Sequence, residues 1–257
     1  MHLDRVLLIL ETIAVAGRAL SAPELQCATG LPRPTCYRLL QTLAVHGLLD
    51  DSERNSRYLI GERFIRIASL ARSDADLRYA TAPMLKDTAI RLGEAVFLSR
   101  LRDHSVEIIH VETPSDPSRD YIHPGLGSRP MNACSCSKAI AAFADEEFRE
   151  RVLNGPLRAY TDRTKISQDS LRDEFSEIRE NGYAECIEEI EVGISSVAAP
   201  ILVGEAGATF SVGATGPIRR FTDTHRTMVG NDLKNLARRV GSVIFMHISG
   251  ENLEIRQ

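Results

Sequence analysis

The stretch that decides the fold is GLPRPTCYRLLQTLAVHGLL, residues 30–49. At helical spacing, its apolar face carries Cys36, Leu39, Leu40 and Leu43. The opposite face carries Pro34, Thr35, Tyr37, Arg38, Gln41 and Thr42. A solvated helix usually has Glu and Lys on its outer face, whereas no acidic residue occurs between Pro32 and Leu49. We therefore expect this face to contact something other than water.

The flanking segments complete a winged helix-turn-helix. Apolar residues at helical spacing predict a first helix over 3–16. Ser21 and Glu24 have capping-box spacing, which predicts a second helix over 22–28, and Gly30 separates it from the third. The third helix is expected to end near Gly47. The runs 48–50 and 57–60 can pair as strands across the polar turn DSERNS, residues 51–56.

Composition and charge set broad limits on the class of protein. The 257 residues are 43% hydrophobic and 26% charged, which suits one large globular domain or two ordinary ones. The net charge is −4, so any nucleic-acid site must be a local patch. No apolar run reaches the ~18–20 residues of a transmembrane helix, and we expect no signal peptide. The five sparse cysteines are expected to be free thiols in a reducing cytoplasm.

The rest of the chain alternates helical and strand patterns. A linker helix is predicted over 62–78, with Phe64, Ile67, Ala68 and Ala71 facing inward. Strands are expected within 94–101, 104–112, 183–187, 196–202 and 208–215. Further helices are expected over 82–92, 135–143, 145–153, 167–181 and 223–246. The predicted fold is α+β, and its second domain contains a mixed, largely antiparallel sheet covered by helices.

Three segments resemble the IclR family of bacterial transcriptional regulators. The first is the winged-helix segment LPRPTCYRLLQTLAVHGLLDDSERNSRYLIGERF, residues 31–64. The second is MNACSCSKA, residues 131–139, which matches a family loop through Ala133, Lys138 and Ala139. The third is ENGYAECIEEIEVGISSVAAPI, residues 180–201. They occur in the family's order and with its spacings, so the resemblance extends over nearly the whole chain.

The resemblance implies a domain organisation and a function. It implies a winged-helix DNA-binding domain over 1–61, the linker helix over 62–78, and a GAF-like effector-binding and oligomerisation domain over 79–257. Such a protein is a homodimer or tetramer on double-stranded operator DNA. Its effector is a small carboxylate or an aromatic metabolite, and it needs no cofactor and catalyses no reaction.

The third helix carries residue types that suit DNA. In a major groove, Arg pairs with guanine, Gln pairs with adenine, and Thr or Tyr bonds to phosphate or base. The candidate DNA-contacting residues, the last two of them on the wing, are Ser21, Arg33, Thr35, Tyr37, Arg38, Gln41, Arg57 and Tyr58. The alternatives are an ordinary solvated helix and a winged helix that serves only dimerisation. The lack of acidic residues favours DNA.

The start of the helix predicted over 135–143 is a candidate anion site. Exposed backbone N–H groups and the helix dipole favour a carboxylate there, and Ser135 and Ser137 add hydroxyl donors. The alternative is that these serines only cap the helix. By the resemblance, the candidate effector-binding residues are Ala133, Cys134, Ser135, Ser137, Cys186, Ile194, Ser196, Gly213 and Thr215.

Several of these positions depart from the family pattern. Asn132 and Ser137 stand where the family has His and Gly, and Cys186, Ser196 and Gly213 replace Asp, Cys and Ser. The thiol of Cys186 makes the pocket floor less polar. Gly213 is expected to add room, which would admit a larger or partly apolar acid.

The cysteines leave a redox alternative open. The C-x-C spacing of Cys134 and Cys136 differs from the C-x₂-C spacing of zinc sites, and no metal site is expected. A thiol-based redox-sensing regulator could use these two residues with Cys186. The plainer interpretation is that they fill space around a pocket.

An enzyme is the alternative from a different class: a small-molecule-binding enzyme whose winged helix does not bind DNA. Glu185, Glu188, Glu189 and Glu191 form an acidic cluster that could hold paired catalytic carboxylates. A rim of the pocket or a solvated turn explains the cluster more simply. No nucleophile elbow or phosphate-binding glycine loop is present in the sequence.

Overall fold

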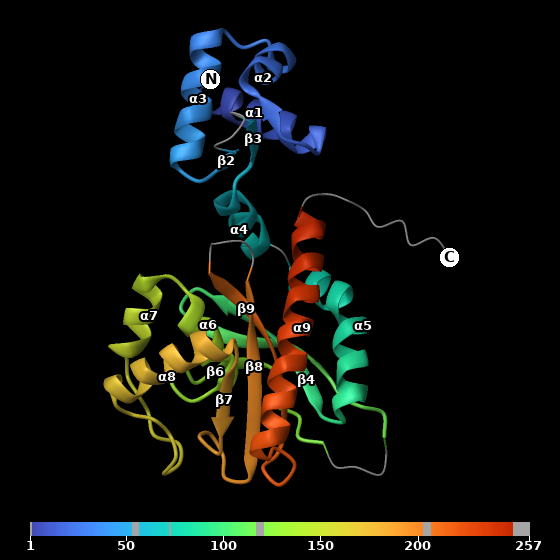
Figure 1. Cartoon of the computed structure of the whole chain (residues 1–257), viewed down its shortest axis with the longest axis vertical. Coiled ribbons are helices and arrows are strands. Elements are labelled where there is room, and N and C mark those ends of the chain that lie inside the picture. The colour runs from blue at the N-terminus through green and yellow to red at the C-terminus, as the bar shows by residue number, and fades with distance from the viewer. Residues whose placement is uncertain (1, 53–56, 72, 117–120, 203–206, 249–257) are drawn as a thin grey trace. The chain divides into compact units, whose positions relative to one another are not determined.

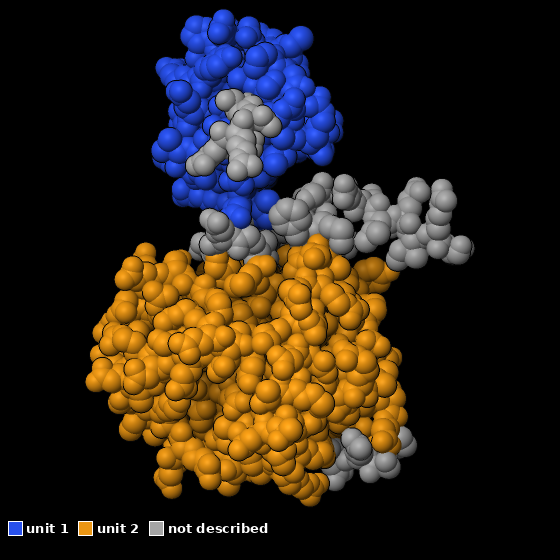
Figure 2. Space-filling view, viewed as in Figure 1, with its two compact units in different colours: residues 1–71, 245–257 blue, residues 72–244 orange. Residues whose placement is uncertain are grey.

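The computed structural model describes residues 2–52, 57–71, 73–116, 121–202 and 207–248. The chain divides into two compact units, residues 1–71 with 245–257 and residues 72–244 (Figure 2). Within the described ranges, no helix combines the length and the apolar character that crossing a membrane requires.

Unit 1 is a winged helix-turn-helix, as the sequence predicts. Its elements are α1 (His2–Ala16), β1 (Leu20–Ser21), α2 (Ala22–Thr29), α3 (Arg33–Val45), β2 (Leu49–Ser52), β3 (Arg57–Ile60) and α4 (Glu62–Ala71). The strands form an antiparallel sheet in the order β1-β3-β2. The apolar faces of α1, α2 and α3 meet in one core, which includes Ile9, Leu25, Leu39 and Leu40. Of the predicted wing turn, residues 53–56 lie outside the described residues, whereas Asp51 and Ser52 belong to β2.

The predicted capping box at the start of α2 is present. The Ser21 hydroxyl accepts a hydrogen bond from the Glu24 backbone N–H at 3.4 Å, and the Ser21 backbone N–H donates to the Glu24 carboxylate at 2.8 Å. The hydrogen bonds from the backbone and side chain of Ser21, with that from Arg18, lower the pKa of Glu24 to about 2. At the other end, Gly30 has φ +65°, a left-handed conformation that lets α2 end and α3 begin almost at once.

The predicted linker helix over 62–78 is two helices. The first, α4, covers Glu62–Ala71, and the second, α5, covers Asp74–Leu92. The Ser73 hydroxyl accepts from the Asp76 N–H and so caps a new helix, which continues through Pro83 because its buried residues keep helical spacing. In α4, Ile65 is buried, whereas Ile67 is 54% exposed, so the predicted inward position of Ile67 is wrong. The side chains of Ala68 and Ala71 lie outside what the structure describes.

Unit 2 contains a six-stranded sheet in the order β6-β5-β4-β9-β8-β7, and all neighbouring strands are antiparallel. Its strands are β4 (Ala95–Arg102), β5 (Ser105–Glu112), β6 (Gly127–Arg129), β7 (Ala184–Ile187), β8 (Ile194–Leu202) and β9 (Ala208–Pro217). Its helices besides α5 are α6 (Ser135–Phe143), α7 (Glu146–Leu153), α8 (Gln168–Asn181) and α9 (Asp223–Ile248). The predicted α+β class is confirmed.

Helices cover both faces of this sheet. Helices α5 and α9 lie on one side, and α6, α7 and α8 lie on the other (Figure 1). The inner strands β8 and β9 are therefore buried along nearly their whole length. Eight residues of α6, from Ser135 to Ala142, are buried, so this helix has almost no solvent face.

Replacing Ser21 with Ala removes the hydroxyl of the α2 capping box. We expect the free energy of unfolding to fall by about 1 kcal/mol, because the first-turn N–H groups lose their acceptor. Equilibrium urea unfolding of the full chain, followed by circular dichroism, measures this loss. Thr42→Val is the control in the same unit, because the Thr42 hydroxyl only donates to the Arg38 carbonyl inside α3; its effect should stay within about 0.5 kcal/mol. Equal losses for the two variants would contradict the capping role.

Candidate DNA-binding face and effector pocket

The polar face of α3 is open to solvent. Arg33, Arg38 and Gln41 are exposed, and Thr35 and Tyr37 are half-buried. The guanidinium of Arg33 lies 5.5 Å from the ring centroid of Tyr37, within the range of a cation–π contact. Because Cys36, Leu39, Leu40 and Leu43 are buried on the other side, the helix cannot turn this face inward.

The wing candidates divide into exposed and buried residues. Arg57 is half-exposed, and its guanidinium donates to the Ala19 carbonyl at 3.0 Å. The predicted contact through Tyr58 needs correction: its side chain is only 8% exposed and belongs to the unit 1 core. Burial is also the main cause that raises the pKa of Tyr58. The Ser21 hydroxyl is half-buried and engaged in the cap of α2.

A cavity of about 130 Å³ lies between the start of α6 and the sheet. Five of the nine predicted effector residues line it: Cys134, Cys186, Ile194, Ser196 and Thr215. Residues that sequence reasoning missed complete most of the wall: Phe97, Ile108, Ile122, His123, Arg129 and Ile190. Only strand pairing brings Phe97 of β4 and Ile108 of β5 to this place, and no local motif marks them.

The other four predicted residues do not line the cavity. Ala133 and Ser137 are fully buried, and Ser135 lies behind the wall, where its hydroxyl is 2.7 Å from that of Ser196. Ser135 therefore supports a wall residue. Cys134 is both the N-cap residue of α6 and part of the wall, so the start of this helix borders the cavity.

Gly213 does not add room, contrary to the sequence prediction. It is paired with Phe97 across strands β4 and β9. A Cβ at this position would lie 2.2 Å from Phe97 Cζ and 2.8 Å from the Val197 carbonyl oxygen. The aromatic ring already occupies the space that the missing side chain leaves, so Gly213 places Phe97, rather than extra room, at the cavity wall.

An ion cluster anchors α6 behind the pocket. The Lys138 ammonium is fully buried and donates to Glu174 at 2.7 Å and to Glu189 at 2.6 Å. Burial alone would lower the pKa of Lys138, but the two carboxylates outweigh it and raise that pKa. Burial raises the pKa of Glu189 despite the nearby ammonium. Lys138 is charged and held in place at any physiological pH.

Three carboxylates of the acidic cluster in and after β7 are held by cations rather than arranged as a catalytic pair. The Glu185 carboxylate is 2.9 Å from Arg226, and that of Glu188 is 3.2 Å from Arg163. Glu189 belongs to the Lys138 cluster, and Glu191 is an exposed residue on the cavity wall. Each position has a structural explanation.

The thiols beside the cavity are close together but protected. Cys134 Sγ and Cys136 Sγ are 3.3 Å apart. The hydrogen bond to Cys136 and burial raise the pKa of the Cys134 thiol, and burial raises the pKa of Cys186 to about 12. Thiolate formation is thus unfavourable at these two positions. Burial also acts to raise the pKa of Cys136, but hydrogen bonds from Cys134 and Ser99 outweigh it and lower that pKa. Across the described ranges, no cluster of three His, Cys, Asp or Glu side chains could hold a metal ion.

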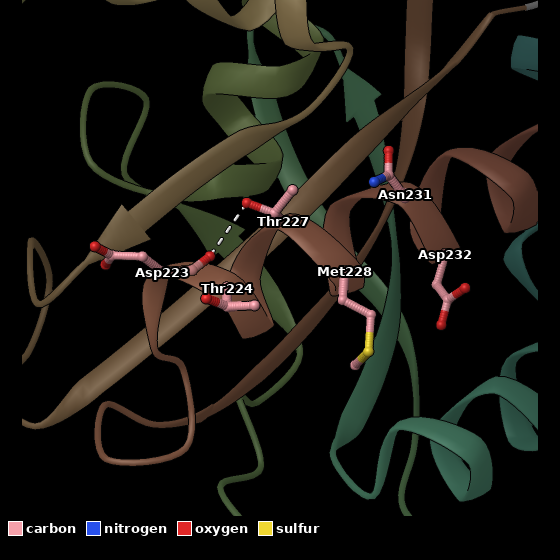
Figure 3. A pocket seen from close by; sticks show the side chains of 6 residues that line it. All are labelled: Asp223, Thr224, Thr227, Met228, Asn231 and Asp232. Carbon is pink, nitrogen blue, oxygen red and sulfur yellow. Dashed lines mark hydrogen bonds between the residues drawn. The ribbon is translucent and has the colours of Figure 1, made fainter.

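Another hollow lies along α9 (Figure 3), and the labelled side chains all come from that single helix. The hydroxyl of Thr227 is turned back to the Asp223 carbonyl of the same helix at 3.1 Å. This hollow, in contrast to the cavity beside α6, does not bring together polar groups from several elements.

Comparison with known proteins identifies the family. The IclR helix-turn-helix domain matches residues 2–52, and the bacterial transcriptional regulator IclR C-terminal domain matches residues 70–242. The glycerol operon regulatory protein of Streptomyces coelicolor is 29% identical over 218 residues, 85% of each chain. The transcriptional repressor IclR of Escherichia coli K12 is 28% identical over 240 residues, 93% of this chain and 88% of its own.

Two solved structures share the fold. The IclR protein of Thermotoga maritima has a TM-score of 0.61 at 24% identity, covering 95% of this chain and 98% of its own. An IclR homologue from Microbacterium hydrocarbonoxydans, complexed with 4-hydroxybenzoate, has a TM-score of 0.58 at 22% identity, covering 95% and 99%. The chain belongs to the IclR family of bacterial transcriptional regulators: it is a DNA-binding regulator with an N-terminal helix-turn-helix and a C-terminal effector domain.

Gly213→Ala should destabilise the protein by roughly 1–3 kcal/mol, because the new methyl group overlaps the Phe97 ring. Chemical denaturation of the full chain measures the loss. The double variant Phe97→Leu with Gly213→Ala tests whether the Phe97 ring causes this loss of stability. If the ring is the obstacle, the two changes are less destabilising together than the sum of the single effects. Strict additivity would assign the loss to the backbone instead.

Proposed function

We propose that this chain binds operator DNA through the polar face of α3, and that a small carboxylate bound beside α6 changes its affinity for that DNA. The observation that carries the proposal is the solvent-facing set of Arg33, Arg38 and Gln41 on a helix without an acidic residue. A second helix of a helix-turn-helix enters the major groove with such residues toward the bases.

The DNA contacts have different roles. Arg38 and Gln41 suit bidentate pairing with guanine and adenine, and Arg33, Thr35 and Tyr37 suit contacts at the start of the helix. Arg57 and Ser21 are candidates for phosphate contacts that position the domain. Tyr58 is left out, because its ring lies in the core.

Self-association supports operator binding. A single module of this size contributes limited affinity, so a homodimer or tetramer on a palindromic site is expected. The α1 helix supplies apolar surface for an interface between copies of the chain: Leu3 is 58% exposed and Leu7, one turn later, is 45% exposed. We also retain the cytoplasm as the location and the domain limits 1–61, 62–78 and 79–257 as predictions.

The effector proposal rests on the cavity beside α6. It combines hydroxyl groups of Ser196 and Thr215 with the N-terminal end of a helix, which favours an anion. The solved relative that holds 4-hydroxybenzoate supports a small carboxylate as the class of effector.

Contacts of α5 offer a route from the cavity to the linker. The Asp74 carboxylate at the start of α5 accepts hydrogen bonds from Arg100 at 2.9 Å and Arg102 at 2.8 Å, both on β4. Arg78 donates to the Ile109 carbonyl of β5 at 2.6 Å. Strands β4 and β5 also carry the wall residues Phe97 and Ile108. A ligand that binds one arrangement of these strands better than another would bias α5 and the chain that leads to the DNA-binding unit.

Neither alternative function gains support. Redox sensing through Cys134, Cys136 and Cys186 would have to use buried thiols. The pKa values of Cys134 and Cys186 are raised, and Cys136, whose pKa is lowered, is fully buried and closed to an oxidant. Catalysis is not supported, because the carboxylates of the acidic cluster are either engaged by cations or exposed. The relatives are also named as regulators.

The first experiment is a fluorescence anisotropy titration of the full chain against the intergenic DNA beside its own gene. We expect sequence-selective binding that weakens steeply with salt, because phosphate contacts release counterions. Binding no tighter than to random DNA, at low salt and with the oligomer intact, would overturn the proposal.

Arg38→Ala combined with Gln41→Ala should weaken operator binding by a few kcal/mol, since each base pairing contributes ~1–3 kcal/mol. Anisotropy at fixed salt measures the loss for the operator and for random DNA. The loss should be much larger for the operator. Arg172→Ala, which removes an exposed arginine of α8, is the control and should bind as the wild type does. Full retention of operator affinity in the double variant would disprove the role of α3.

Ser196→Leu should abolish the response to effector and leave the affinity for operator unchanged. The larger side chain enters a cavity of only about 130 Å³ and loses the hydroxyl contact with Ser135. The measurement is the operator titration with and without the effector. Ser242→Leu, at an exposed position of α9, is the control and should respond normally. An unchanged response in Ser196→Leu would place the effector elsewhere.

A further inference from the structure

Arg129 has an unusual place in the cavity wall. It lies on β6, and it is the single Lys or Arg among the residues that line this cavity. Its Nε atom is buried and has no hydrogen-bond partner in the part of the chain that the structure describes. No ion pair joins it to a carboxylate within the same ranges. The side chain is half-buried, so its positive charge lies beside the cavity without an acidic partner among the described residues.

The guanidinium is nevertheless held in one orientation. Its Nη2 atom donates to the Gly125 carbonyl at 2.6 Å and to the Pro124 carbonyl. Gly125 has φ +73°, so the turn that supplies these carbonyls depends on a left-handed residue. The turn therefore holds Nη2, and the buried Nε is closed to a ligand in the cavity, so a carboxylate would meet the guanidinium through Nη1.

We propose that Arg129 binds the carboxylate of the effector. This inference rests on the proposed function, since it takes the cavity as the effector site and adds its charge partner. The rest of the ligand then lies against Phe97, Ile108 and Ile194, which make the neighbouring wall apolar.

Cavity size and charge narrow the class of ligand. A cavity of about 130 Å³ is close to the ~150 Å³ that accommodates benzene, so the ligand is one small ring or a short chain. One cation matches one carboxylate. The carboxylate of Glu191 belongs to the same wall and repels a second anionic group. The site therefore selects small monocarboxylates, with Ser196, Thr215 and His123 near a further polar group.

The test compares acids with their neutral amides on the full chain. Isothermal titration calorimetry with benzoate and benzamide, and with 4-hydroxybenzoate and 4-hydroxybenzamide, measures the preference for the charged ligand. Wild type should bind an acid roughly 10- to 100-fold more tightly than its amide, as expected for a charge-assisted hydrogen bond. Phthalate, which carries two carboxylates, should bind more weakly than benzoate.

Arg129→Gln should lose the preference for acid while its affinity for the amide changes little. Arg129→Lys keeps the charge without the planar fork and should retain part of the preference, which provides a second variant if Gln impairs folding. Arg172→Gln is the matched control and should behave as wild type.

The outcomes separate this inference from the proposed function. An unchanged acid preference in Arg129→Gln would overturn the role of Arg129, whereas the effect of Ser196→Leu on the response would still stand. If the wild-type chain binds operator but none of the acids, the ligand class is overturned. The DNA-binding function then remains intact. Failure of operator binding itself would contradict the proposed function directly.

Discussion

The buried ammonium of Lys138 determines how the effector domain is assembled. It joins α6 to Glu174 on α8 and to Glu189 after β7, at 2.7 and 2.6 Å. Because α6 has almost no solvent face, its one cation needs partners from the elements around it. The same contact fixes the turn that carries Ile190 and Glu191, both on the cavity wall. Removing Lys138 would leave the buried carboxylates of Glu174 and Glu189 without the cation that they share.

Next to this ion cluster, the cavity has one wall of tightly packed side chains and one wall with a cation that lacks an acidic partner among the described residues. Ser135 supports Ser196 from behind, and the ring of Phe97 closes the space over Gly213. Opposite them, the guanidinium of Arg129 is oriented by backbone carbonyls but has no acidic partner in the described parts of the chain. A site that is preorganised yet short of one charge binds an anion without first having to reorder its side chains.

In unit 1, the packing of one helix, α3, determines which side chains are exposed. The inner face of α3 is committed to the core through Cys36, Leu39, Leu40 and Leu43, so its polar face is presented by packing rather than by local preference. The capping box of Ser21 and Glu24, with the left-handed Gly30, fixes the short turn between α2 and α3. Exposure of Arg38 and Gln41 follows from these buried contacts.

The sequence by itself determined the elements with strong local signals: the helical spacing of α3, the Ser21–Glu24 cap, the α6 start and the family motifs. It missed β1 and β6, because two- and three-residue strands exist only through their partners. It placed a helix across 62–78, where the Ser73 cap begins a new one. Tertiary structure alone put Tyr58 in the core, filled the space at Gly213 with Phe97, and brought Arg129 to the cavity. These outcomes depend on residues distant in sequence, and spacing along the chain carries no information about which strands become neighbours.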